Sequence, residues 1–167
     1  YLEYICDSFL MERVERYDVK GKRYIESPYK YYFVDLGLRN ARLNFRQLEK
    51  THMMENVIYN ELRVRGFNID IGVVHVYKNN SEGKTTRSNL EIDFVCNQGS
   101  KRYYIQSAYS MPTEEKVEQE EASLRNINDS FKKIVITKDM VPSYYDENGI
   151  LTMNIYDFLL DDKSLEK

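Results

Sequence analysis

The chain of 167 residues contains few of the residues that crosslink secreted domains or bind zinc. It has two cysteines, Cys6 and Cys96, which lie far apart and form no C-x-x-C pair, and two isolated histidines, His52 and His75. This composition argues against a disulfide framework and against a zinc site. A reduced, cytoplasmic compartment is therefore the expected location.

Several sequence patterns that define broad protein classes are also missing. No run approaches the roughly 18 apolar residues of a membrane span, and no secretory segment is present. No G-x-x-x-x-G-K-[ST] motif occurs, so any ATP binding is expected only in an upstream segment. No histidine or nucleophile elbow accompanies Ser107 or Ser110, which argues against acyl transfer. Because the chain opens with Tyr1 rather than methionine, we expect it to be part of a longer protein.

The charges show no strongly basic stretch of the kind that marks many nucleic-acid-binding surfaces. The net charge is −3, and residues 111–167 carry seven Lys/Arg against thirteen Asp/Glu. This acidic segment favours a protein partner over DNA, although DNA stays a candidate partner and oligomerisation stays open. Tryptophan is absent whereas tyrosine occurs fifteen times, which is typical of half-buried strands more than of base-stacking platforms.

The clearest helix is expected at residues 52–65, where apolar side chains share one arc and Gly66 supplies the stop. Glu61 falls inside this arc and Glu55 lies at its edge. An acid that faces a core needs a partner, because an unpaired buried charge is costly. The arc favours Glu61 for an inward role.

The other segments predict alternating strands and helices. Before the helix we expect two strands within residues 8–34 around a turn at 18–22, and a short helix capped by Asp35. After it we expect strands at 68–77, 90–96, 102–109, 133–137 and 150–153, helices after Thr113 and at 155–160, and a polar loop at 78–88. This order predicts an α/β sandwich with a mixed sheet.

Two neighbouring strands carry polar residues that suit a metal site. Alternation places Glu91 and Asp93 on one face of the first strand, and Gln106 and Ala108 on one face of the second. An aspartate on one strand, polar groups on the next and a helix glutamate would suit Mg²⁺ or Mn²⁺, which prefer oxygen ligands and activate water against a phosphodiester. On spacing alone, an E-x-D pair is more often a solvated strand face than a ligand pair.

Three segments together resemble a known family: residues 30–40 (KYYFVDLGLRN), 54–62 (MENVIYNEL) and 91–95 (EIDFV). They resemble an uncharacterised C-terminal domain of bacterial and archaeal P-loop, AAA+-type ATPase-like proteins. That domain is similar to the PD-(D/E)xK restriction-endonuclease-like fold. The resemblance implies a three-layer sandwich with a mixed central sheet over residues 51–162. Residues 1–50 would then be a small N-terminal extension that links it to an upstream P-loop ATPase module.

Carried over by position, the family pattern assigns the helix acid to Glu55 (or Glu61) and the strand acid to Asp93, with Asp93 and Glu55 as candidate metal ligands. Gln106 and Ala108 stand where the pattern has an acid and a lysine, so the resemblance implies a degenerate site that has lost catalysis. The motif favours Glu55 whereas the helical arc favours Glu61, and the choice stays open. Lysines that could arrive from elsewhere are Lys101, Lys116 and Lys138.

Three functions follow, in this order of preference. The first is a catalytically degenerate nuclease-like domain that recognises nucleic acid or protein. The second is a structural or oligomerising domain in which residues 1–50 dock on the ATPase module. The third is a Mg²⁺-dependent DNA endonuclease that works with a reduced carboxylate site.

Overall fold

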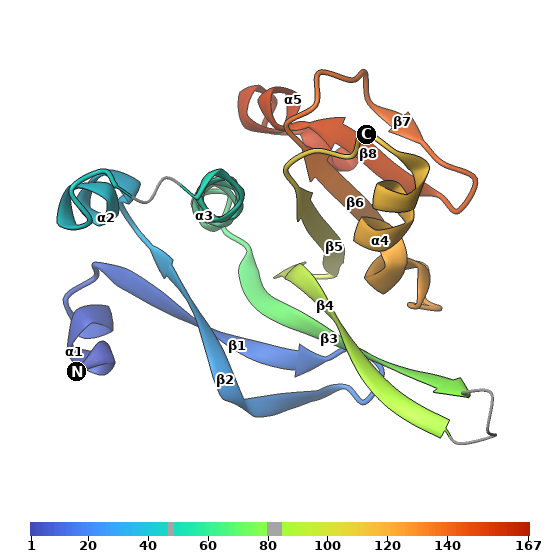
Figure 1. The fold of residues 1–167 in the computed structure, drawn as a ribbon, viewed down its shortest axis with the longest axis horizontal. Coiled ribbons are helices and arrows are strands. Elements are labelled where there is room, and N and C mark those ends of the chain that lie inside the picture. Colours follow the sequence, from blue (N-terminus) through green and yellow to red (C-terminus); the bar gives the residue numbers. More distant parts are fainter. Residues whose placement is uncertain (47–48, 80–84) are drawn as a thin grey trace.

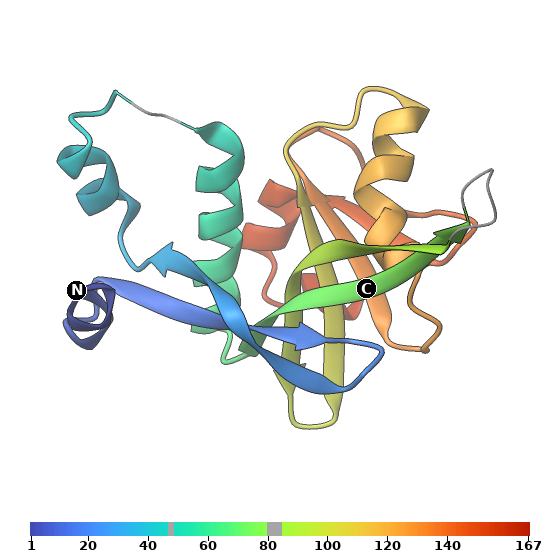
Figure 2. The same ribbon diagram turned by 60° about the horizontal axis from the view of Figure 1, so that its bottom comes forward.

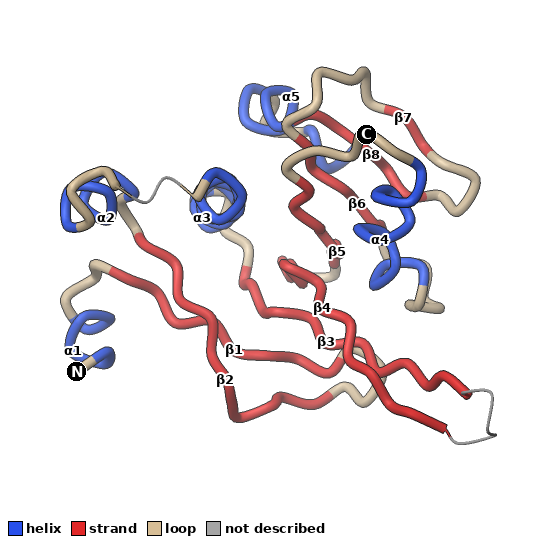
Figure 3. The backbone as a smooth tube through the Cα atoms, in the orientation of Figure 1, coloured by secondary structure: helices blue, strands red, loops and turns tan. Residues whose placement is uncertain are grey.

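A computed structural model describes residues 1–46, 49–79 and 85–167. Eight strands form one sheet in the order β2-β1-β3-β4-β5-β6-β8-β7 (Figures 1 and 3). The strands are β1 (Met11–Asp18), β2 (Arg23–Phe33), β3 (Asn68–Asn79), β4 (Thr85–Gln98), β5 (Lys101–Ala108), β6 (Lys132–Thr137), β7 (Tyr144–Tyr145) and β8 (Ile150–Asn154). The helices are α1 (Leu2–Asp7), α2 (Leu36–Arg42), α3 (Lys50–Val64), α4 (Glu114–Arg125), α5 (Ile155–Leu160) and the 3₁₀ turn η1 (Ser164–Glu166).

The sheet is mixed. Neighbours β1 and β3, β5 and β6, and β6 and β8 run parallel, and the other neighbouring pairs run antiparallel. The β1–β2 hairpin continues the same sheet beyond β3, as Figure 2 shows. Residues 11–33 are thus hydrogen-bonded to the rest of the domain, while the division of function at residue 50 stays a prediction.

Helices cover both faces of the sheet. On one face α3 and α5 bury Ile58, Leu62 and Phe158 against strand residues such as Phe94 and Ile105, and we call this apolar group the first core cluster. On the opposite face α4 covers the second core cluster, which includes Leu124, Ile92, Val95, Tyr104 and Ala108. The predicted α/β sandwich with a mixed sheet is confirmed at this level.

Most of the predicted elements are present. The hairpin turn, the helix that Asp35 caps through the amides of Gly37 and Leu38, and the strand–helix order after residue 50 all form as expected. The predicted polar loop at 78–88 is wrong in extent, because β3 continues to Asn79 and β4 begins at Thr85. The middle of that loop, residues 80–84, lies outside the described residues. The short elements α1, β7 and η1 carry too few residues for a periodic signal and were not predicted.

None of the helices in the described part of the chain combines the length and the apolar character that crossing a membrane requires.

Candidate functional site: a carboxylate cluster around Lys30

A bulge in β4 shapes the site. The β3–β4 ladder changes register between Asp70 and Gly72, so that Asp93 and Phe94 together stand opposite a single residue of β3. Such a bulge breaks strict side-chain alternation and re-aims side chains. Phe94 accordingly packs in the first core cluster, and the buried Asp93 carboxylate lies on the same side of the sheet as Glu55 of α3.

The helix acid of this site is Glu55. It is buried on α3, and its Oε1 atom accepts a hydrogen bond of 2.6 Å from the hydroxyl of Tyr32 on β2. Glu61 lies elsewhere, because its carboxylate pairs with Arg65 one helical turn later at 2.8 Å. The structure thus brings Glu55 together with Asp93 and leaves Glu61 out, contrary to the inward role that the helical arc favoured.

Lys30 of β2 lies at the centre of the carboxylates. Its Nζ atom is 2.6 Å from Glu55 Oε1, 3.0 Å from Glu91 Oε1 and 3.5 Å from Asp93 Oδ1. Arg16 of β1 completes the group by pairing with Glu91 Oε2. We call Glu55, Glu91 and Asp93 with Lys30 the carboxylate cluster.

Strand β5 contributes to this cluster differently from the sequence prediction. The amide of Ser107 donates a hydrogen bond of 2.9 Å to Asp93 Oδ2, and Gln106 Oε1 accepts one of 3.4 Å from the Asp93 amide. Ala108 packs in the second core cluster on the opposite face, so a lysine at this position would not point at Asp93. Alternation instead places Ser107 on the face of the carboxylates together with Ile105.

Ser107 therefore occupies the position where β5 approaches the cluster. Its side chain is buried, and its Oγ atom has no hydrogen-bond partner within the described part of the chain. No acid or lysine of β5 faces the cluster, because the inward residues beside Asp93 are Ile105 and Ser107. The E-x-K step assigned to Gln106 and Ala108 is thus absent in space as well as in sequence.

The proton affinities of these groups depend strongly on one another. Burial raises the pKa of Asp93 to about 7, and the Glu55 carboxylate adds to the rise while Lys30 opposes it. Burial by itself would lower the pKa of Lys30, but the carboxylates of Asp93 and Glu55 raise it above its ordinary value. Burial and the Glu55 carboxylate raise the pKa of Tyr32. Near neutral pH the cluster can therefore exchange a proton at Asp93 while Lys30 stays charged.

Glu91 behaves differently from Asp93 because two cations hold it. Burial would raise the pKa of Glu91, but Lys30 and Arg16 together lower it below its ordinary value. Glu91 therefore stays ionised at neutral pH and anchors Lys30 from the side of β4.

The three lysines proposed from the sequence lie away from the cluster. Lys101 pairs with Glu166 at 2.6 Å, Lys116 pairs with Glu120 at 2.5 Å, and Lys138 lies over the ring of Tyr109. The lysine that does reach the carboxylates is Lys30. Lys30 is part of the family-like segment 30–40, but it is too far from residues 55, 91 and 93 in the sequence for any local motif to indicate that it contacts them.

The oxygen donors of the cluster have the chemistry that Mg²⁺ or Mn²⁺ prefers. As arranged, however, they do not fit a divalent cation, because the Lys30 ammonium already contacts all three carboxylates. In the ranges 1–46, 49–79 and 85–167, no three or more His, Cys, Asp or Glu side chains are grouped so that they could hold a metal ion. What the cluster holds is therefore a positive charge supplied by the chain itself.

Comparison with known proteins gives two family matches and two relatives. Residues 50–158 match a family described as "Domain of unknown function (DUF4143)", and residues 1–49 match one described as "Domain of unknown function (DUF8612)". An uncharacterised protein of Haemophilus influenzae is 29% identical over 163 residues, which are 96% of this chain and 36% of that protein. An uncharacterised protein of Methanocaldococcus jannaschii is 32% identical over 111 residues, which are 66% of this chain and 22% of that protein.

No solved structure matches the chain. The chain spans roughly a third or less of the length of these two relatives, since the aligned parts are 36% and 22% of them. The first family match covers well over half of the chain, from residue 50 to residue 158. The chain therefore belongs to the DUF4143 family of domains.

Proposed function

We propose that this domain is a non-catalytic relative of the PD-(D/E)xK nucleases that serves as a recognition module of a longer, cytoplasmic ATPase-like protein. Its intramolecular partner would be an upstream P-loop ATPase module. The mixed sheet with helices on both faces is compatible with the three-layer sandwich that this fold requires. The pairing of a helix acid, Glu55, with a strand acid, Asp93, supports the nuclease-like assignment.

One observation carries the loss of catalysis: an ammonium group lies where three carboxylates converge. A divalent cation would have to displace Lys30 from Glu55 and Asp93, both of which are buried. Such a displacement would break the ion pairs of Lys30 and leave its partly buried ammonium without a carboxylate partner. The β5 strand offers no further acid toward the cluster to repay that cost. The domain then keeps the shape of a nuclease site without its metal.

The experiment is a calorimetric titration with Mn²⁺ of the wild-type protein and of three variants: Asp93→Ala, Lys30→Met, and the two changes combined. The proposal expects no binding at millimolar Mn²⁺ by the wild type or by Asp93→Ala. It expects binding by Lys30→Met, because the buried carboxylates of Glu55 and Asp93 then lack a cation, and loss of that binding in the double variant. Wild-type Mn²⁺ binding together with DNA cleavage, both abolished by Asp93→Ala, would overturn the proposal.

A specific observation also favours a working Mg²⁺-dependent nuclease as a second candidate. Lys30 supplies a cationic side chain next to Asp93 and Glu55, which position 108 does not. In that case, Lys30→Met and Asp93→Ala would each abolish cleavage of plasmid DNA. The two candidates thus differ in the wild type, which cleaves plasmid DNA only under the second, and in Lys30→Met, which gains Mn²⁺ binding only under the first.

Exposed apolar side chains support the docking alternative, in which residues 1–50 contact the ATPase module. Tyr1, Tyr4, Phe9, Leu38 and Phe45 all expose more than half of their surface. Where such side chains are contiguous, they mark surfaces that bind partners. If recognition is only of protein, a gel-shift assay at low salt should show no nucleic-acid binding, because phosphate contacts are strongest there.

A further inference from the structure

Strands β1 and β3 diverge and leave a gap in the sheet. Their ladder covers only Arg16–Asp18 of β1 and Ile71–Val73 of β3, and the residues before these on both strands lie outside it. Alternate residues of a strand direct their backbone groups toward the same neighbour. Because Val19 donates its amide to the carbonyl of Val73, alternation along β3 directs the backbone groups of Ile69 into the gap. Alternation along β1 would direct those of Glu15 there too, beside the register change of the β1–β2 ladder between Val14 and Arg16. The strand gap thus presents two facing strand edges, of the kind that accept a further strand.

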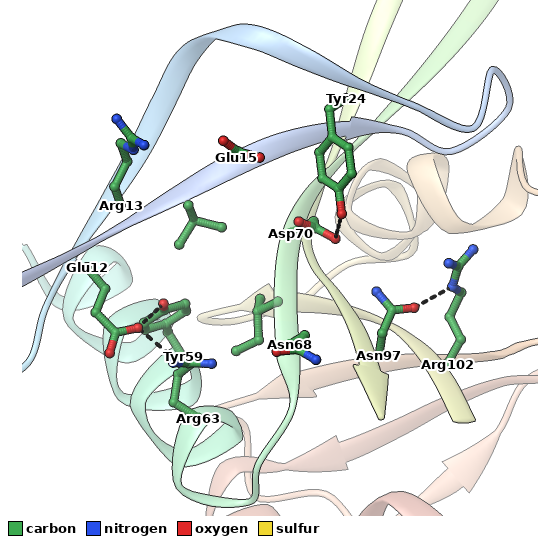
Figure 4. A pocket seen from close by; sticks show the side chains of 12 residues that line it. Glu12, Arg13, Glu15, Tyr24, Tyr59, Arg63, Asn68, Asp70, Asn97 and Arg102 are labelled. Atoms are coloured by element: carbon green, nitrogen blue, oxygen red, sulfur yellow. Dashed lines mark hydrogen bonds and ion pairs between the residues drawn. The ribbon is translucent and has the colours of Figure 1, made fainter. Parts of the chain in front are cut away.

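An open cavity of about 670 Å³ occupies the strand gap, and Figure 4 shows the side chains around it. Val14 and Ile69 give it an apolar wall between β1 and β3. Tyr24 of β2 and Asp70 of β3 lie together on one side, joined by a hydrogen bond of 3.5 Å. Most of the other lining residues are charged or polar, so the cavity suits a polar ligand more than an apolar small molecule.

The arginines that line the cavity are already engaged. Arg63 pairs with Glu12 at 2.9 Å, Arg102 donates a hydrogen bond of 2.7 Å to Asn97, and Arg13 lies over the ring of Tyr29. An anionic ligand such as a phosphate would therefore compete with existing contacts.

Two carboxylates that line the cavity are left over. Neither Asp70 nor Glu15 makes an ion pair with any residue that the structure describes. Burial raises the pKa of Asp70, the nearby Glu15 carboxylate adds to that rise, and the Tyr24 hydroxyl and Arg102 oppose it. A cation placed between Asp70 and Glu15 would relieve the repulsion between these two carboxylates, although the formal charges of the whole lining balance.

We infer that the strand gap between β1 and β3 binds an extended basic peptide segment of a partner protein. The peptide backbone would pair with the free edge at Glu15 or at Ile69, and a lysine or arginine side chain would pair with Asp70 and Glu15. A backbone edge alone would accept any extended chain, and the two carboxylates select a cationic one. This site is separate from the carboxylate cluster, and the inference holds whether or not that cluster binds metal.

The test uses the capped peptide Thr-Lys-Val-Lys-Thr, which has the length and alternation of a short strand, titrated into the ¹⁵N-labelled protein. We expect saturable binding with a Kd below about 1 mM, and the largest amide shifts at Arg13, Glu15 and Ile69. The matched peptide Thr-Glu-Val-Glu-Thr should not bind. Spermidine, a cation without a peptide backbone, should bind more weakly and leave the amide of Ile69 unshifted.

The variants Asp70→Asn and Glu15→Gln keep the side-chain shape and remove one charge each. Each should weaken binding of the lysine peptide about tenfold, as expected for loss of a charge-assisted contact. The control Glu118→Gln removes an exposed carboxylate on α4 and should leave the Kd unchanged.

Absence of binding at several millimolar peptide would overturn the inference, as would equal binding of the glutamate peptide. Amide shifts of the wild-type protein that are confined to another surface would also overturn the inference. This test needs no variant, so it holds even if a variant fails to fold. Spermidine binding as tight as that of the lysine peptide would reduce the site to a simple cation site and refute the strand-addition part. None of these outcomes depends on Mn²⁺ binding, so failure here and failure of the proposed function are distinguishable.

Discussion

Replacing Lys30 with methionine removes the ammonium from the carboxylate cluster while it keeps most of the apolar stem. Removing one partner of a buried ion pair costs about 3–5 kcal/mol, because the other charge stays buried without compensation. Two features reduce this cost: the Lys30 side chain keeps 26% of its exposure to water, and Asp93 can take up a proton since its pKa is already about 7. We therefore expect a loss of about 2–3 kcal/mol at pH 8.

The loss should be smaller at pH 6. Asp93 is then largely protonated, so Lys30→Met leaves fewer uncompensated charges. Urea denaturation followed by circular dichroism at both pH values measures the difference. The control is Lys116→Met, which breaks a pair with Glu120 on the surface of α4. Lysine and methionine have similar helix propensities, and an exposed pair contributes about 0–1 kcal/mol.

The reasoning would be refuted in either of two ways. If Lys30→Met lost no more stability than Lys116→Met at pH 8, the cluster would be as well solvated as a surface pair. If the loss at Lys30 were the same at pH 6 and pH 8, Asp93 would not be the group that takes up the proton.

Three further predictions follow from the same region. Folding raises the pKa of Asp93, so the stability that its protonation contributes is present below about pH 4 and is lost as the pH rises toward 7. In the wild type, the unfolding free energy should therefore decline between pH 5 and pH 8, and Asp93→Asn should remove about 2–3 kcal/mol of that decline. An unchanged pH profile in urea titrations would contradict this. Tyr32→Phe removes the 2.6 Å hydrogen bond to Glu55 and should lower the unfolding free energy by about 1–2 kcal/mol; a urea midpoint equal to that of the wild type would speak against that bond. Gly72→Ala places a methyl group 2.9 Å from Ile92 Cβ beside the bulge and should cost about 1–3 kcal/mol, seen as a lower Tm; an unchanged Tm would mean that the strands can move apart.

Local rules were enough to predict the strand part of the carboxylate cluster. Strand alternation predicted that Glu91 and Asp93 share a face, and both do contact Lys30. The family-like motif also favoured Glu55, which is the helix acid that shares Lys30 with Asp93. The helical arc failed at Glu61 because a neighbouring cation, Arg65, satisfies that carboxylate at the edge of the core. Hydrophobic periodicity describes only where apolar residues recur, and it does not indicate which acidic side chain has a cation close enough to pair with.

The features that the sequence did not reveal are those set by register. The bulge at Asp93 and Phe94 depends on how β3 and β4 pair, which composition does not encode. Which β5 side chains face the cluster depends on which β5 residue lies beside Asp93. In the structure this residue is Ser107, whereas the sequence prediction named Gln106 and Ala108. A motif spacing counted along one strand does not detect a change of register, because register describes how residues of two neighbouring strands pair.

The position of Lys30 links two segments that match different families. Lys30, Arg16 and Tyr32 belong to residues 1–49, whereas the carboxylates Glu55 and Asp93 belong to residues 50–158. The ammonium of Lys30 and the hydroxyl of Tyr32 both contact acids of the second segment. Since an uncompensated buried charge is strongly destabilising, the β1–β2 hairpin supports the second segment electrostatically as well as through its sheet hydrogen bonds. The boundary between the two family matches therefore runs through the carboxylate cluster: its cation and its anions come from opposite sides of it.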